Sequence, residues 1–165
     1  MRPVGKIQEE LMDYYGWIVF THAIAAAAFV MTMIIMQLVV SNVMKRIPDS
    51  PGKKDGVSFI QKHWHPVVDA IIIVLGLTAI GIALLNFDMI ISSSIFLTKI
   101  IIGLVALGAA YCNHFYLRYV KRELAASGRN PDRLKKIGRL MPVLDKVALI
   151  GGVVTALIGW YINHV

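Results

Sequence analysis

The chain has 165 residues, of which 57% are hydrophobic, and it carries a formal net charge of +7. The hydrophobic share exceeds the roughly 45–50% of soluble domains and argues against a soluble fold, while the length suits one domain over residues 1–165. Because the basic residues fall between apolar stretches, membrane topology explains them without nucleic-acid binding, and the single cysteine excludes an internal disulfide.

The N-terminal tail predicts an amphipathic helix that lies on the membrane surface. Apolar residues recur there at spacings of three and four with acidic residues between them, namely Val4, Ile7, Leu11 and Tyr15. The apolar run 17–40 follows. It is longer than the hydrophobic region of a cleaved signal peptide and long enough to cross a bilayer, so it is the predicted first span.

Three further segments have the length and composition of a membrane span: residues 66–91, 95–117 and 141–162. Pro66 and Pro142 are expected in the first turns of the second and fourth spans, where a proline removes no helical hydrogen bond. Small residues at spacings that let helices approach closely predict helix contacts. They are Gly76, Gly81, Ala106, Ala110, Gly152 and Ala156.

The predicted loops 41–65 and 118–140 hold 13 of the 17 basic residues. The positive-inside rule places both loops in the cytoplasm and both termini outside. The second loop is expected to form a basic hairpin that attracts anionic lipid headgroups, with a break at Ser127-Gly128 and a short helix capped near Asn130-Pro131-Asp132. The prediction is therefore an all-α, integral membrane four-helix bundle, multi-pass in a prokaryotic-type inner or cell membrane.

Ionisable residues within the spans are the candidates for function, because each is costly there unless it is paired or used. They fall into two tiers. The outer tier is His22 and Lys99, joined by His164, and the inner tier is His63, His65, Asp69, His114, Asp145 and Lys146. By helix rise, His22 and His114 are roughly 20 Å apart along the membrane normal, so they are not expected to ligate one haem between them.

Each of these residues also has a purely structural interpretation. His22 and His114 could form hydrogen bonds between helices, and His63 and His65 could lie at the lipid interface beside a tryptophan. Lys99 could extend to the interface. Asp145 and Lys146 point about 100° apart, so one is expected to bind a neighbouring helix and the other to reach the interface.

Three short patterns resemble a known group. They are Trp17-Ile18-Val19-Phe20-Thr21-His22, then Leu97-Thr98-Lys99 with an apolar run to His114, and then Arg139-Leu140-Met141-Pro142. This chain resembles the CopD/HemJ-like superfamily of small four-helix membrane proteins, in which HemJ members are haem-b-associated protoporphyrinogen oxidases and CopD members are linked to copper. The resemblance implies His22 and Lys99 as the site.

The chain departs from that family at two places. After the first histidine it has Phe29-Val30-Met31-Thr32-Met33 where HemJ members have an aromatic, glycine and arginine-containing stretch. It also has Arg139-Leu140-Met141-Pro142 where they have Asn-Glu-x-Pro. The oxidase motifs are incomplete, so an enzyme acting on its own is not expected, while a haem-binding helical frame is.

Three functions follow as hypotheses. The first is a haem-b-binding membrane protein acting in electron transfer or as a quinone-linked subunit, with other membrane subunits or a redox partner. Its cofactor-binding candidates are His22, Lys99, His114, His65 and His63, of which His22 and His114 are the candidate iron ligands. The second is a cofactor-free accessory subunit of a larger complex. The third is copper or other metal handling through His22, Met33 and Met36. The alternative role of the two methionines is packing.

Overall fold

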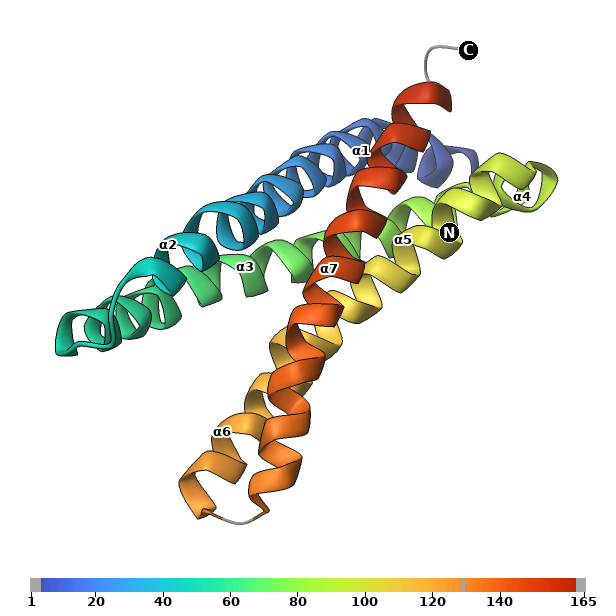
Figure 1. Cartoon of the computed structure of the whole chain (residues 1–165). Helices are drawn as coiled ribbons and strands as arrows, with labels where there is room; N and C mark the ends of the chain where they lie inside the picture. Colours follow the sequence, from blue (N-terminus) through green and yellow to red (C-terminus); the bar gives the residue numbers. More distant parts are fainter. Residues whose placement is uncertain (1–3, 129, 163–165) are drawn as a thin grey trace.

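The computed structural model describes residues 4–128 and 130–162, with the side chains of residues 4–13, 61 and 89 left out (Figure 1). Every element in these ranges is a helix. In chain order they are α1 (Val4–Ile34), the π-helix η1 (Ile35–Val40), α2 (Ser41–Arg46), α3 (Pro51–Leu85), α4 (Phe87–Ser92), α5 (Ser94–Tyr111), the π-helix η2 (Cys112–Leu117), α6 (Arg118–Ser127) and α7 (Pro131–Ile162).

Four continuous helical stretches are long and apolar enough to cross a membrane: Tyr14–Arg46, Pro51–Leu85, Ser94–Ser127 and Pro131–Ile162. The predicted all-α class is confirmed. At most 22% of the most apolar window in any stretch is buried inside the chain, so most of the apolar surface is free to contact lipid. The tail helix exists but runs into the predicted first span without a break, and of its predicted amphipathic side chains Val4, Ile7 and Leu11 lie outside the described set, while Tyr15 is half-buried.

The expectation that Pro66 and Pro142 open their helices is wrong. Both lie inside long helices, α3 and α7. The proline in the first turn of α3 is Pro51 instead, and the Ser50 hydroxyl accepts a hydrogen bond from the Lys53 backbone at 3.3 Å. Here the helix begins in the polar sequence ahead of the apolar stretch. Composition therefore located the span but not the start of the helix.

The connections at the ends of the helices are specified locally. The Lys53 ammonium donates a 2.7 Å hydrogen bond to Asp49 and holds the pKa of that carboxyl below its usual value. Gly128 ends α6 with φ of +62°, and the Asn130 side chain accepts a hydrogen bond from the Arg133 backbone at 3.2 Å. The predicted break and restart at these residues are confirmed, but the helix that follows is not short: α7 runs without interruption to Ile162. The predicted second span is interrupted near Asn86, between α3 and α4.

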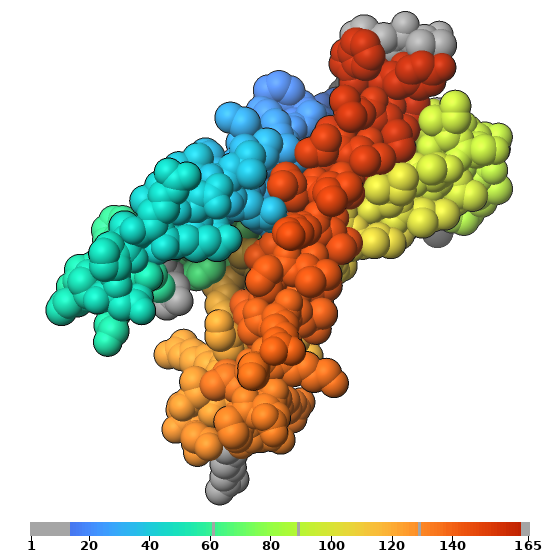
Figure 2. Space-filling view, in the orientation of Figure 1, coloured from blue at the N-terminus to red at the C-terminus, as the bar shows by residue number. Residues whose placement is uncertain are grey.

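The helices form two antiparallel pairs that cross each other (Figure 1). One pair is α1 with α3, and the other is α5 with α7. We call the end that holds the α2–α3 and α6–α7 connections the basic end, and the end that holds α4, the start of α1 and the end of α7 the terminal end. Figure 2 shows that the two pairs separate toward the basic end and leave an open wedge between α2 and α6.

The core lies where the pairs cross. It contains Phe29 and Met33 from α1, Val68 and Ile72 from α3, and small residues from α5 and α7, namely Ala109, Ala110 and Ala148. Small residues make the closest helix contacts, as predicted, but the tightest one is at Gly151, where a Cβ would lie 2.7 Å from the Ala106 Cβ. Its neighbour Gly152 faces Phe29 instead.

Candidate functional site

His22 is held by the helix opposite it. Its Nδ1 lies 2.9 Å from the Thr78 hydroxyl oxygen, and that hydroxyl lies 2.7 Å from the Val74 carbonyl. A hydroxyl has one hydrogen, so if it donates to the carbonyl, the imidazole must donate Nδ1–H to the hydroxyl oxygen. That tautomer leaves the Nε2 lone pair of His22 available to an outside partner.

Lys99 lies near the same level of the bundle. Its Nζ reaches across to α7, 3.0 Å from the position that a Cβ on Gly159 would occupy. It is close enough for its charge to act on His22. In the described part of the chain, it has no hydrogen bond or ion pair. His164, expected in this tier, lies outside the described residues.

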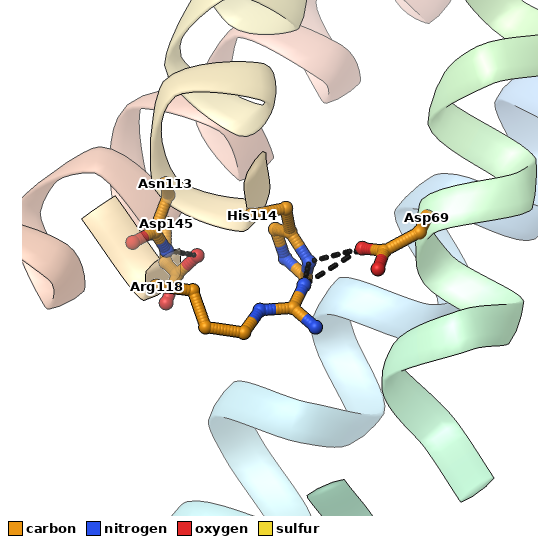
Figure 3. A network of polar contacts seen from close by, with 5 residues as sticks. All are labelled: Asp69, Asn113, His114, Arg118 and Asp145. Atoms are coloured by element: carbon orange, nitrogen blue, oxygen red, sulfur yellow. Dashed lines mark hydrogen bonds and ion pairs between the residues drawn. The ribbon is translucent and has the colours of Figure 1, made fainter. Parts of the chain in front are cut away.

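A second polar group joins the two helix pairs on the basic-end side of the core (Figure 3). Asp69 on α3 accepts a 2.7 Å hydrogen bond from Arg118 on α6, and the same carboxylate oxygen lies 3.1 Å from His114 Nδ1 on η2. Arg118 also lies 2.7 Å from that nitrogen. Sequence reasoning placed Arg118 in a basic loop and missed this role, because a long side chain reaches back more than its position suggests.

One nitrogen cannot satisfy both of its neighbours. If His114 Nδ1 carries a hydrogen, it donates to Asp69 but opposes the Arg118 N–H at 2.7 Å. If it carries a lone pair, it accepts from Arg118 but opposes the Asp69 oxygen at 3.1 Å. The position of one hydrogen therefore decides which of the two contacts is favourable.

Asn113, the residue before His114, points toward α7 and donates a 2.6 Å hydrogen bond to Asp145 (Figure 3). Asn113 is only 4% exposed, and its Oδ1 is buried without a hydrogen-bond partner among the described residues. Lys146, beside Asp145, is exposed. Asp145 therefore contacts a neighbouring helix, as expected for one residue of the pair, while the expectation that the other reaches the interface stays a prediction.

The remaining inner histidines separate. The rings of His65 and His114 meet edge to face with centroids 5.8 Å apart. His63 is exposed and stacks on Phe59, away from them. An edge-to-face pair does not present two nitrogens to a common iron from opposite sides, as two axial ligands do, so the inner histidines do not form a ready haem clamp.

The two tiers are distinct sites. His22 bonds to Thr78 and His114 contacts Asp69, and these partners are nine residues apart on α3. That spacing corresponds to about 13 Å along the helix axis. His22 and His114 therefore contact different levels of α3, as the sequence predicted, although the separation along this helix is shorter than the roughly 20 Å expected.

The methionines of the first span do not join His22. Met33 is 3% exposed and belongs to the core, whereas Met31 is 60% exposed. Met33 follows His22 by 11 residues of continuous helix, which is about 16 Å and too far for one ion. Within the described residues, no group of three or more His, Cys, Asp or Glu side chains could hold a metal ion.

Fold and site together define an all-helical protein with four membrane-length helices and two polar tiers. Comparison with known proteins adds no closer assignment: no protein-family model matches the chain, and no curated protein and no solved structure is detectably similar to it.

Proposed function

We propose that this chain is a haem-b-binding membrane protein that serves electron transfer within a larger membrane complex. The observation that carries the proposal is the contact between His22 Nδ1 and Thr78. Histidines that bind a metal usually donate the other ring N–H to a fixed acceptor, which orients the ring and increases its basicity. The contact fits that arrangement, and His22 Nε2 would then be the nitrogen that binds the iron.

The residues around His22 fit a haem group in charge as well. A haem carries two propionate carboxylates, and Lys99 is a cation without an anionic partner in the described structure. We assign Lys99 to a propionate and His22 to the iron. The haem supplies one-electron chemistry. The protein holds the iron through His22, orients that ring through Thr78, and neutralises charge through Lys99.

The test is a visible spectrum of the purified, haem-replete protein in oxidised and dithionite-reduced forms, with a pyridine haemochrome assay for stoichiometry. We expect a b-type spectrum that is lost in His22→Gly and restored by added imidazole. Rescue by imidazole separates loss of a ligand from loss of the fold. His114→Gln is the matched control and should keep the spectrum. A protein that remains colourless at full haem supply would reject the proposal.

A second candidate is a cofactor-free accessory subunit. The observation that favours it is the inner network, in which Asp69, Arg118 and Asn113 form hydrogen bonds to other helices of the chain. In this case the polar residues serve helix association. The chain should then co-purify with a larger membrane complex in stoichiometric amount and carry no chromophore.

A further inference from the structure

The basic-end side of the core is the part of the molecule where polar groups are least satisfied. Four buried side-chain atoms of the described residues lack a hydrogen-bond partner: Gln37 Nε2, Trp64 Nε1, His65 Nδ1 and Asn113 Oδ1. All four residues lie on the basic-end side of the core residues of their own helices. Buried polar atoms are normally paired with protein or water, and those that are not call for an explanation.

Both π-helices lie in this same region. The segment η1 contains Gln37, and η2 contains Asn113 and His114. A π-helical turn widens the helix, and such turns recur at functional sites. Within η2, Asn113 contacts Asp145 on α7 and His114 contacts Asp69 on α3, so this segment joins both helix pairs.

The charged and titratable residues of this region form one layer, made up of His65, Asp69, His114, Arg118 and Asp145. Their charges do not balance when the two histidines are neutral. Arg118 compensates Asp69 at 2.7 Å. Asp145 has only a neutral donor, Asn113, and no ion pair with any described cation. One negative charge is left in an apolar bundle, where an uncompensated charge is costly.

We propose that Asp145 and His114 form a proton-binding site that takes up one proton from water at the basic end. On uptake, an O–H bond forms at Asp145 or an N–H bond forms at His114, and hydronium becomes water. The layer then carries no net charge. His65, whose ring contacts His114 and whose Nδ1 is unpaired, is positioned to pass the proton inward.

The surroundings of the pair are consistent with one exchangeable proton. The charged and titratable groups that face it are Asp69 and His65 on α3 and Arg118 on α6, and each acts on His114 or Asp145. From η1, Gln37 lies on the same side of the core and carries no charge. Lys146 is exposed and does not pair with Asp145. The proposal does not rest on haem binding.

The test uses the full chain in nanodiscs, with His63→Gln as the parent protein so that this exposed histidine adds no signal of its own. Infrared difference spectra report protonated carboxyl groups, and ¹⁵N spectra of histidine-labelled protein report imidazolium. Between about pH 8 and about pH 5.5, exposed carboxyls stay ionised because their pKa values are near 4. We expect either a carboxyl C=O band that shifts in D₂O or an imidazolium signal that His114→Gln removes.

The controls decide the assignment. Asp145→Asn removes the uncompensated charge and should abolish the signal, whereas Asp88→Asn, an exposed residue on α4, should leave it unchanged. A signal that survives Asp145→Asn in folded protein contradicts the proposal. So does the absence of both signals in the parent protein, a result that is decisive even if Asp145→Asn does not fold.

Discussion

Thr78 makes a test of the outer tier at the scale of one residue. Replacing it with valine keeps the shape of the side chain and removes the oxygen that His22 contacts at 2.9 Å. Because loss of such an orienting partner typically lowers metal affinity about 10–100-fold, we expect Thr78→Val to weaken haem binding by that factor. Haem titration followed at the Soret band measures it.

The matched control is Thr98→Val. The Thr98 hydroxyl is exposed and donates only to the Ser94 carbonyl of its own helix, at 2.8 Å. It should therefore leave haem affinity unchanged. Equal affinities in Thr78→Val and the unmodified protein would mean that the hydrogen bond does not orient the ligand.

Gly151 tests helix packing at the same scale. A Cβ there would lie 2.7 Å from the Ala106 Cβ, so Gly151→Val must push α7 away from α5. We expect a loss of about 1–3 kcal/mol in the free energy of unfolding, the usual cost of overpacking. Unfolding in mixed SDS and detergent micelles, followed by circular dichroism, measures this.

Gly108→Ala provides the comparison, since a Cβ at Gly108 meets nothing within 4 Å. It should be neutral or stabilise by up to about 1 kcal/mol, because alanine has the higher helix propensity. If both substitutions had the same effect, the α5–α7 contact would not be close.

At the scale of elements, the α6–α7 hairpin depends on Gly128. Its φ of +62° is left-handed, where a residue with a Cβ costs about 1–2 kcal/mol. Gly128→Ala should therefore destabilise the hairpin by that amount, seen as faster amide hydrogen exchange in α6. Gly138→Ala, within α7 with open space around it, should slow exchange or leave it unchanged. The opposite order would contradict the turn geometry.

Elements also show which predictions the sequence supported. The length of the apolar stretches predicted the four long helices, and Gly128 with Asn130 predicted the break in the hairpin, because these signals are local. The start of α3 at Pro51 was missed, and so was the continuity of α7 from Pro131 into the fourth apolar stretch, since hydropathy follows the apolar part of a helix and not its hydrogen bonds. The π-helices have no signature in one sequence, and the partners of Asn113 and His114 depend on how the helix pairs pack, so neither could be predicted.

The site was predicted only in part for a related reason. The intramembrane position of His22, Asp69, His114 and Asp145 marked them as candidates. Their partners, however, are polar residues of ordinary type, such as Thr78, that become informative only when two helices meet. Arg118 looked like one more positive charge in a loop until the fold placed it against Asp69.

At the scale of the whole molecule, orientation in the membrane is the open prediction. In a Cys112→Ala background, which removes the single cysteine, we expect K54C and R133C to react with a membrane-impermeant maleimide only from the cytoplasmic side. D88C should react only from outside. All three positions are exposed. The reverse pattern would overturn the predicted orientation, and labelling of all three from one side would contradict the four spans.

Because the two helix pairs cross at the core, a small rotation there produces a larger displacement at the ends of the helices. The pairs touch near their middles, and each extends roughly 20 Å beyond that point toward the basic end. A rotation of about 10° at the core would displace each tip by about 3–4 Å by this geometry. Small changes in the packing of Ala148 and Ile72 would thus be amplified at the basic end, where they would widen or narrow the wedge between α2 and α6.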